Sequence, residues 1–307
     1  MTTDSNEQQP LINSFPENHK SGYVAIVGKP NAGKSTLLNA LLGSKLSITT
    51  HKPQTTRHRV IGIYSKPDSQ IIFVDTPGII QPKYKLQEAM MQNVAVARQD
   101  ADIIVCVIDA TDKKPDSKVF LPLKNLHKPV IMVVNKMDLT TQEEVLPLVD
   151  ELTQEYRFDL VLYVSAIKKE GLEPLIESIL QRIPPGPPFY PKDMISEHPE
   201  RFFVAELIRE QLFLQFQQEI PYSCAVNIVM FEEGEDLDRI DAEIVVNRES
   251  QKGILIGKKG RALKKLGTAA RKSIEEFLGK QIYLNIHVKV RPKWRNRDTF
   301  IRNYGYK

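Results

Sequence analysis

The chain has 307 residues, enough for two domains, and its hydrophobic content of 41% is sufficient to build real cores. Its longest apolar runs, such as Ile103–Ile108, are too short to cross a bilayer, and the polar first 20 residues lack the apolar core of a signal peptide. Because Cys106 and Cys224 are the only cysteines and lie in apolar runs, we expect no disulfide framework and take the cytosol as the default compartment.

Charge is divided unevenly along the chain. The overall net charge is +4, but residues 253–307 contain 15 Lys and Arg against 3 Asp and Glu, a net charge of +12. The first 252 residues therefore carry a net charge of −8. This asymmetry predicts an anionic partner for the basic end, either nucleic acid or an anionic membrane surface.

Residues 21–183 alternate apolar strand patterns with helical patterns. The expected strands are 23–27, 59–64, 71–74, 103–108, 130–134 and 160–164, and the expected helices are 36–42, 86–99, 142–157 and 171–182. Continuous apolar strands separated by helices are typical of an α/β domain with a mostly parallel sheet and helices on both faces. The motifs below follow strand ends, where such sheets bind ligands.

The first expected strand runs into Gly28-Lys29-Pro30-Asn31-Ala32-Gly33-Lys34-Ser35, which Thr36 and a helical run follow. The motif G-x-x-x-x-G-K-[ST] between a strand and a helix predicts a phosphate-binding loop rather than an ordinary glycine turn. Its backbone N–H groups and the positive end of the helix form an anion hole, which Gly33 lets the phosphates approach. We expect Lys34 to reach the β- and γ-phosphates and the Ser35 hydroxyl to bind Mg²⁺.

The segment Asn135-Lys136-Met137-Asp138 follows the fifth expected strand and predicts which base is bound. The Asp138 carboxylate can accept from both N1–H and the exocyclic amine of guanine, a donor pair that adenine lacks. We expect Asn135 to tie this turn to the phosphate loop and the stem of Lys136 to cover the ring. Ser165-Ala166, after the last strand, fits a backbone donor to guanine O6. These motifs in this order predict a GTP site rather than unrelated turns.

Two further segments complete the expected phosphate site. Asp75-Thr76-Pro77-Gly78 follows a strand, and we expect Asp75 to hold Mg²⁺ through water and the Gly78 N–H to contact the γ-phosphate. The Thr-rich loop of residues 44–59 is expected to supply another Mg²⁺ ligand, with Thr56 preferred over Thr55. An ordinary surface turn is the alternative interpretation of this loop.

The residue after Gly78 is Ile79, whereas Ras-type enzymes place there a Gln that orients the attacking water. An isoleucine cannot do this. Either hydrolysis is very slow or another group takes over the role that this glutamine has in Ras-type enzymes.

Five prolines between residues 184 and 191 predict a stiff linker, which we place at 184–197. Beyond it we expect a helix at 199–218, strands at 223–231 and 240–247, a short helix, and then a helix at 261–278 and a strand at 282–290. The order is α-β-β-α-α-β. The expected domains are thus a disordered extension at 1–20, a nucleotide-binding domain at 21–183, the linker, and a second domain at 198–307 with a basic tail.

Gly257-Lys258-Lys259-Gly260 lies between two expected helices of the second domain. In KH domains a G-x-x-G loop at this place clamps the backbone of about four nucleotides. The element order and the basic charge favour RNA binding over a solvated basic face, a membrane contact or a protein contact. The expected RNA-binding residues are this loop together with Lys264, Lys265, Arg271, Lys289 and Arg291. The aromatic residues Trp294, Phe300, Tyr304 and Tyr306 could stack on bases, although packing of a terminal helix is the more common role.

With both halves considered, the chain resembles the Era family of bacterial ribosome-assembly GTPases over residues 22–307. The segments that carry the resemblance are 28–35, Lys52-Pro-Gln-Thr-Thr-Arg-His-Arg59, 75–78, 135–138, 164–166, Ile254-Leu-Ile-Gly-Lys-Lys-Gly260 and Val288-Lys-Val-Arg-Pro-Lys-Trp-Arg295. The ending Asn303-Tyr304-Gly305-Tyr306 departs slightly from the family pattern. The resemblance implies a Ras-like P-loop GTPase domain followed by an α+β type II KH domain.

The resemblance also implies a function. Proteins of this kind hydrolyse GTP slowly to GDP with Mg²⁺, bind the single-stranded 3′ end of 16S rRNA through the KH domain, assist maturation of the 30S subunit, and associate peripherally with the inner membrane. We expect a monomer in the cytoplasm. Two rival interpretations remain, an RNA chaperone that binds GTP with negligible turnover and a membrane-recruited GTPase whose basic face meets anionic lipid.

Several GTPases that resemble this chain and carry a hydrophobic residue at the position of Ile79 use the loop asparagine, here Asn31, to hold a potassium ion against the phosphates. Such an ion could replace the arginine that many GTPases import, with backbone carbonyls of residues 44–56 as its other ligands. The alternative is that Asn31 only hydrogen-bonds within the loop. The expected catalytic residues are therefore Asn31, Lys34, Thr56 and Gly78.

Overall fold

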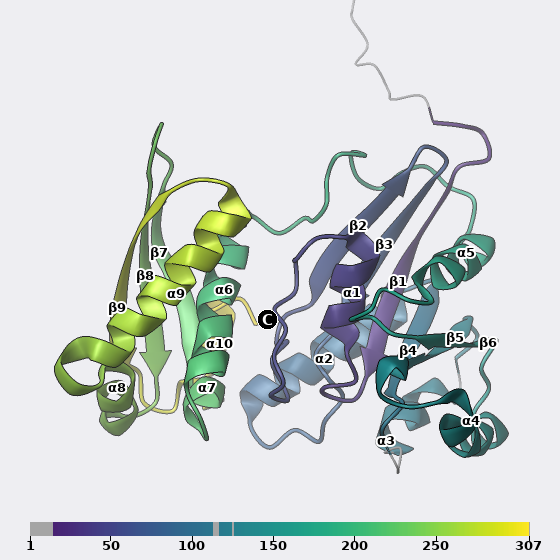
Figure 1. Ribbon diagram of the computed structural model, residues 1–307, viewed down its shortest axis with the longest axis horizontal. Helices are drawn as coiled ribbons and strands as arrows, with labels where there is room; N and C mark the ends of the chain where they lie inside the picture. The colour runs from purple at the N-terminus through teal and green to yellow at the C-terminus, as the bar shows by residue number, and fades with distance from the viewer. Residues whose placement is uncertain (1–14, 113–116, 125, 307) are drawn as a thin grey trace, which may run out of the picture.

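A computed structural model describes residues 15–112, 117–124 and 126–306 of the chain. They form two domains that lie side by side, each with its own sheet (Figure 1). Most of the extension expected at 1–20 lies outside the described residues, and the first strand already begins at Lys20. No helix in the described ranges is both long and apolar enough to cross a membrane.

The first domain is built on a six-stranded sheet of order β2-β3-β1-β4-β5-β6. Its strands are β1 (Lys20–Gly28), β2 (Val60–Lys66), β3 (Ser69–Asp75), β4 (Ile103–Asp109), β5 (Val130–Asn135) and β6 (Leu160–Val164). All neighbouring strands are parallel except β2, which is antiparallel to β3. The α/β prediction of a mostly parallel sheet is confirmed.

Helices cover both faces of this sheet because its strands are apolar on both faces. The longer helices are α1 (Lys34–Leu42), α2 (Lys85–Asp100), α4 (Gln142–Glu155) and α5 (Leu172–Arg182). Since side chains alternate along a strand, Ile72 packs in the cluster that includes α2 and α4, whereas Phe73 packs in the cluster that includes α1 and α5. Three short segments were not predicted, α3 (Ser117–Phe120), η1 (Leu121–Leu123) and η2 (Met137–Leu139).

Residues 184–197 lie against the first domain. The Ile63 N–H donates to the carbonyl of Ile195 (2.9 Å), and the Gln70 amide donates to the carbonyl of Tyr190 (2.8 Å). This segment therefore follows the edge strand β2 before the chain enters the second domain. The domain boundaries drawn from the sequence remain a prediction.

The second domain contains a three-stranded sheet of order β7-β8-β9, with β7 antiparallel and β9 parallel to β8. Its elements are α6 (Glu200–Gln215), α7 (Ile220–Ser223), β7 (Ala225–Glu232), β8 (Asp238–Val246), α8 (Glu249–Ile256), η3 (Lys258–Gly260), α9 (Arg261–Leu278), β9 (Ile282–Val290), η4 (Trp294–Asn296) and α10 (Asp298–Asn303). Apolar residues of α6 and α9, such as Ile208 and Leu266, pack on Ile240 and Ile244 of β8. The expected α-β-β-α-α-β order is present, with α7 and the C-terminal turns added.

The C-terminal aromatic residues pack between the domains. Trp294 is fully buried and its indole N–H donates to the carbonyl of Ser223 (2.9 Å). Trp294 and Tyr306 share a cluster with Leu86 and Met90 of α2, and Phe300 and Tyr304 pack against that cluster. These side chains are therefore structural in this arrangement, which was the alternative to base stacking.

Candidate functional site

The phosphate loop joins β1 to α1, and two glycines allow its shape. Gly33 has a φ of 93°, and a Cβ there would lie 2.1 Å from Asn135 Nδ2. A Cβ on Gly28 would lie 2.3 Å from the Val107 carbonyl oxygen. Glycine is therefore required at both positions, because any side chain would displace a neighbouring segment.

The ammonium of Lys34 lies inside this loop. Lys34 is buried, and its Nζ donates to the carbonyl oxygens of Lys29 (2.8 Å) and Gly28 (3.3 Å). Burial lowers the pKa of Lys34 to about 8, an effect that the nearby Asp75 opposes. A phosphate group would bring this buried cation the counter-charge that it needs. The side chain of Lys29 turns away and pairs with Asp112 (2.6 Å).

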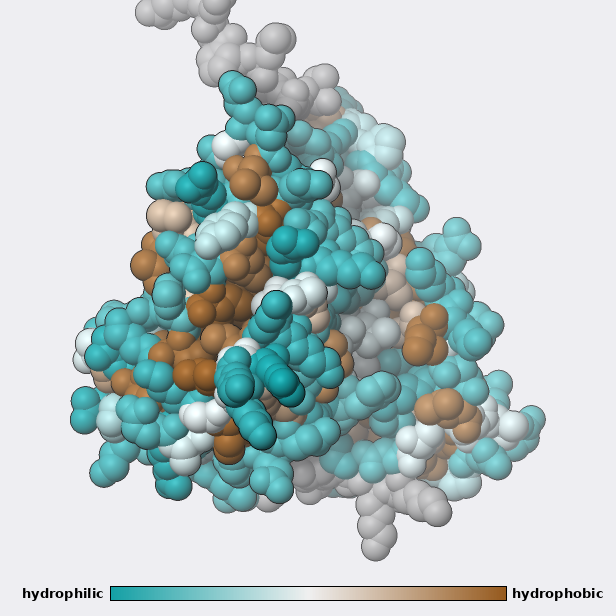
Figure 2. All heavy atoms as spheres, turned by 60° about the vertical axis from the view of Figure 1, so that its left-hand side comes forward, coloured by the Kyte–Doolittle hydropathy of each residue, from teal (hydrophilic) through white to brown (hydrophobic). Residues whose placement is uncertain are grey.

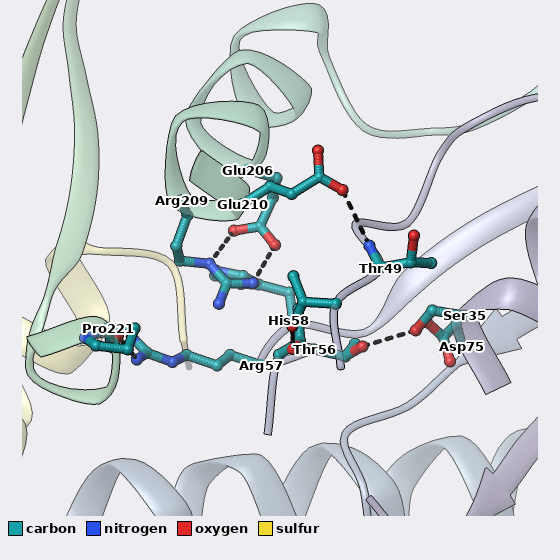
Figure 3. A network of polar contacts seen from close by, with 12 residues as sticks. Ser35, Thr49, Thr56, Arg57, His58, Asp75, Glu206, Arg209, Glu210 and Pro221 are labelled. Carbon is teal, nitrogen blue, oxygen red and sulfur yellow. Dashed lines mark hydrogen bonds and ion pairs between the residues drawn. The ribbon is translucent and has the colours of Figure 1, made fainter. Parts of the chain in front are cut away.

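Oxygen atoms of Ser35, Thr56 and Asp75 converge at the start of α1 (Figure 3). Ser35 Oγ lies 2.6 Å from Asp75 Oδ2 and 2.8 Å from Thr56 Oγ1. Asp75 is fully buried, and its Oδ1 has no hydrogen-bond partner among the described residues. Burial raises the pKa of Asp75 against the influence of Lys34 and Ser35. Hydroxyl and carboxylate oxygens are the ligands that Mg²⁺ prefers, so these residues fit that ion.

Thr55 is turned into its own loop instead. Its Oγ1 lies 2.6 Å from Thr50 Oγ1 and donates to the carbonyl of Lys52 (2.8 Å). Of the two threonines, Thr56 is therefore the one that the structure brings to Ser35.

Asn31 joins the phosphate loop to the Thr-rich loop. Its Nδ2 donates to the carbonyl of His51 (3.0 Å), and its own φ is 66°. The Asn31 amide thus contacts one of the backbone carbonyls of residues 44–56, which were expected to bind a potassium ion together with Asn31.

The segment after Asp75 is anchored to β1 and to the phosphate loop. Thr76 Oγ1 donates to the carbonyl of Ile26 (2.8 Å), and the Ile79 N–H donates to the carbonyl of Gly28 (3.0 Å). A Cβ on Gly78 would lie 2.6 Å from Pro30 N, so this close approach requires glycine. The side chain of Ile79 packs against the hydrophobic core of the sheet, where it offers no polar group to water.

Asn135 links three loops around the expected guanine pocket. It is 2% exposed, its Nδ2 donates to the carbonyl of Ala32 (3.0 Å), and its Oδ1 accepts from the N–H of Ala166 (3.0 Å). The expected tie between this turn and the phosphate loop is thus present. Asp138 is held by Ser165, whose Oγ donates to Asp138 Oδ1 (2.6 Å). The ammonium of Lys136 pairs with Asp109.

In the second domain the loop Gly257–Gly260 opens onto a groove between α9 and β9. Three residues of this loop have positive φ values, 69° at Gly257, 53° at Lys259 and 74° at Gly260. Lys258 and Lys259 are exposed. The groove has a volume of about 480 Å³, and the residues lining it are Gly260, Leu263, Lys264, Gly267, Thr268, Arg271, Leu284 and Ile286. Figure 2 shows apolar surface bordered by hydrophilic side chains on this side of the molecule. An apolar floor suits bases, and a basic rim suits phosphates.

The structure does not bring every expected RNA-binding residue to this groove. Lys264 and Arg271 line it, and Lys265 lies on the neighbouring exposed face of α9. Lys289 instead pairs with Glu243 of β8 (2.8 Å), on the face of β9 opposite to Ile286. Arg291 follows the end of β9.

Sequence reasoning missed the polar residues between the two domains. Arg57 and His58, which follow Thr56, contact α7 and the C-terminal turn, and burial lowers the pKa of His58 to about 4. Glu206 and Arg209 of α6 form a buried ion pair beside them (Figure 3). Polar side chains in an irregular loop leave no periodic signal, so only the structure could pair them.

Comparison with known proteins identifies both domains. A family model described as a 50S ribosome-binding GTPase matches residues 23–136, and a KH domain model matches residues 219–295. The chain is 46% identical to the chloroplastic GTPase ERA1 of Zea mays, over 99% of this chain and 74% of the relative. It is 45% identical to the chloroplastic GTPase ERA-like of Arabidopsis thaliana, over 99% of this chain and 72% of the relative.

Two solved structures have the same arrangement of both domains. One is Era in complex with MgGDPNP and nucleotides 1506–1542 of 16S ribosomal RNA, with a TM-score of 0.90 and 43% identity over 94% of this chain and 99% of that chain. The other is a variant of Aquifex aeolicus Era bound to GDP·AlF4⁻, with a TM-score of 0.89 and 43% identity over the same shares. With these relatives and the nucleotide-site motifs in place, the chain belongs to the Era family, and it is a GTPase with a C-terminal KH domain.

Proposed function

We propose that this GTPase binds the single-stranded 3′ end of 16S rRNA through its KH domain and assists maturation of the 30S subunit. The observation that carries the proposal is the groove beside Gly257–Gly260, with its apolar floor and basic rim. It occurs in a chain that is 43% identical to an Era whose structure holds nucleotides 1506–1542 of that RNA.

In the nucleotide site, we propose contacts from the groups that surround the phosphate loop. The Lys34 ammonium, which now donates to the Lys29 carbonyl, is the proposed contact to the β- and γ-phosphates. Ser35 and Thr56 are the proposed Mg²⁺ ligands, with Asp75 acting through water. The ion, when bound, neutralises charge on the phosphate oxygens. The remaining nucleotide contacts are the backbone of residues 28–36 and 75–78, Lys136, Asp138, and Ser165 with Ala166.

We further propose that turnover depends on positioning rather than on a side chain that activates water. Ile79 packs against the core, so the Gly78 N–H, Lys34 and Thr56 are the groups left to orient the γ-phosphate. Asn31, with the carbonyl of His51 nearby, is the proposed potassium ligand. We expect faster turnover in potassium than in sodium at equal ionic strength, and Asn31→Ala should remove the difference. Equal rates in the two salts would contradict the potassium site.

On the RNA side, the exposed Lys258 and Lys259 are the proposed phosphate contacts, and Leu263 and Ile286 are the proposed apolar floor for bases. Lys264 and Arg271 extend the rim, with Lys265 beside it. Neither Lys289 nor Arg291 lines the groove, and their proposed contribution is to the longer-range positive field.

We place the protein in the cytoplasm as a monomer that contacts the 30S subunit and, peripherally, the inner membrane. A multiple-turnover assay separates this proposal from a chaperone that binds GTP without hydrolysing it. Competition between single-stranded RNA and anionic vesicles separates it from a GTPase recruited mainly by lipid.

The deciding experiment is crosslinking in cells followed by sequencing of the bound RNA. We expect reads concentrated at the 3′ end of 16S rRNA, and their loss when Lys258→Asp and Lys259→Asp are combined. Reads spread over many RNAs, or an unchanged peak in the double variant, would contradict the proposed RNA target.

A further inference from the structure

Two consecutive residues of the loop 44–59, here called the switch loop, reach into different domains. Thr56 Oγ1 lies 2.8 Å from Ser35 Oγ in the nucleotide site. The guanidinium of Arg57 donates to the carbonyl oxygens of Cys224 (2.6 Å) and Pro221 (2.9 Å) in the KH domain. In Figure 3 the two side chains leave the backbone in opposite directions, Thr56 toward Ser35 and Arg57 toward Pro221.

The contacts of Arg57 are those of a buried cation with fixed partners. Arg57 is 3% exposed, its Nη1 also lies 3.4 Å from the Tyr306 hydroxyl, and the guanidinium carbon lies 6.0 Å from the centre of the Phe213 ring. A guanidinium that stays buried without its acceptors has neither hydrogen bonds nor hydration, which is costly. The backbone at Arg57 therefore cannot shift unless the KH domain shifts with it or the side chain is released.

Other contacts hold the switch loop on both sides of this point. Glu210 of α6 accepts from the N–H of Thr49 (3.1 Å) and pairs with Lys45 (2.6 Å), and Lys52 donates to backbone carbonyls near the end of α6. His58 stacks on Tyr306 with ring centres 4.4 Å apart. Of the switch-loop residues that make these contacts, Arg57 is the one that is both buried and next to Thr56 in the chain.

We propose that Arg57 is a positioning residue through which the nucleotide in the first domain and RNA on the KH domain influence each other's affinity. Ligands that hold Thr56 at the nucleotide site also hold Arg57 against Pro221 and Cys224, and release of Thr56 frees that anchor. Because coupling between two binding sites is reciprocal, RNA that changes the position of the KH domain changes the affinity for the nucleotide by the same factor. The inference rests on the RNA-binding function proposed above.

The test measures this coupling factor directly. The affinity of a single-stranded oligonucleotide with the 3′-terminal sequence of 16S rRNA is measured by fluorescence anisotropy, once with GDP and once with GDPNP bound to the full chain with Mg²⁺. We expect the two dissociation constants to differ by about fivefold or more in the unchanged protein. In Arg57→Gln we expect them to agree within about twofold, because the glutamine amide is too short to reach both carbonyls.

Lys45→Gln is the matched control. It removes a different contact between the same loop and the KH domain, from a half-exposed side chain that is not adjacent to Thr56 in the chain, and it should keep the coupling of the unchanged protein. Arg57→Lys keeps the charge and can reach one carbonyl, so its coupling should be intermediate. It also carries the test if Arg57→Gln unfolds.

The outcomes separate the two proposals. The role of Arg57 would be overturned if the coupling factor in Arg57→Gln equalled that of the unchanged protein. It would also be overturned if Lys45→Gln lowered the coupling factor as much as Arg57→Gln does, or if the coupling factor of the unchanged protein were one. A purely structural role would lower the Tm and leave the coupling factor unaltered. Failure of the unchanged protein to bind the oligonucleotide in either nucleotide state would contradict the proposed RNA-binding function itself, and with it the role of Arg57.

Discussion

Replacing Asn135 with alanine removes the side chain that links three loops of the nucleotide site. The substitution deletes the bond from Nδ2 to the carbonyl of Ala32 and the bond from the N–H of Ala166 to Oδ1, both 3.0 Å long. Asn135 is 2% exposed, so the two backbone groups lose their partners in a buried place. Gly33 packs directly on the Asn135 amide, so its loop also loses support.

The magnitude follows from the number of groups left without a partner. A buried backbone group that loses its hydrogen bond costs about 1–3 kcal/mol, so Asn135→Ala should lower the free energy of unfolding by about 2–6 kcal/mol. The same loops contact phosphates and base, so the affinity for GDP with Mg²⁺ should also fall by at least about tenfold, which corresponds to about 1.4 kcal/mol.

Urea unfolding followed by circular dichroism measures the stability change, and titration with a fluorescent GDP analogue measures the affinity change. Asn303→Ala is the control, because Asn303 is exposed at the end of α10 and its replacement should change stability by less than about 0.5 kcal/mol. If Asn135→Ala behaved like this control in both assays, the two hydrogen bonds would not be what joins the loops, and the reasoning would be refuted.

Three further predictions concern titration and charge. Burial lowers the pKa of Lys34 to about 8, and a bound phosphate should raise this pKa. The affinity for GDP should therefore be constant below pH 8 and should fall by up to about tenfold per pH unit above pH 8. A fluorescence titration that gives the same affinity up to pH 10 would contradict this prediction. The pKa of His58 lies near 4 in the folded chain and near 6.5 when unfolded, so the unfolded state binds the extra proton and stability is lost between pH 6.5 and 4. Burial lowers this pKa most, Glu206 opposes the shift, and Arg209, Arg57 and His198 lower the pKa further. Urea unfolding at pH 7.5 and pH 5 should show a loss of stability about 1–2 kcal/mol smaller in His58→Gln than in the unchanged protein, whereas equal losses would rule His58 out. Lys258→Asp combined with Lys259→Asp should weaken RNA binding without changing GDP affinity. The slope of log K for RNA against log salt concentration should fall in magnitude by about 0.7 per lost phosphate contact. An unchanged slope would mean that RNA binds elsewhere, and a parallel loss of GDP affinity would indicate misfolding.

The nucleotide-binding half was predictable because its signals are local. β3 is buried along its whole length, and its apolar run ends directly at Asp75, so both the strand and the position of the motif could be read from the sequence. The same holds for β5 and Asn135. Short turns such as η1 gave no periodic pattern, and their place depends on how neighbouring elements pack.

The contacts between domains could not be predicted, because they join residues far apart in sequence. Arg57 meets Pro221 and Cys224 only because the two domains pack against each other in the folded chain. The sequence identified Thr56 as a metal-ligand candidate, but it gave no sign that the next residue belongs to the KH interface.

For one expected RNA-binding residue, Lys289, the strand pattern alone indicates on which face of the sheet it lies. The alternation along residues 282–290 puts Ile286 and Lys289 on opposite faces of β9. Because Ile286 lines the groove, the Lys289 side chain lies on the other face of the sheet.

The most direct test of the guanine-nucleotide site compares GTP with xanthosine triphosphate in the unchanged protein and in Asp138→Asn. Xanthine carries a carbonyl where guanine has its exocyclic amine, so the asparagine amide can donate where the carboxylate accepted. Loss of a charge-assisted bidentate pair should weaken GTP binding by about 2–4 kcal/mol, roughly 30-fold to 1000-fold, while xanthosine triphosphate binding should improve. Unchanged GTP affinity in Asp138→Asn, with no gain for xanthosine triphosphate, would contradict the assignment of this site.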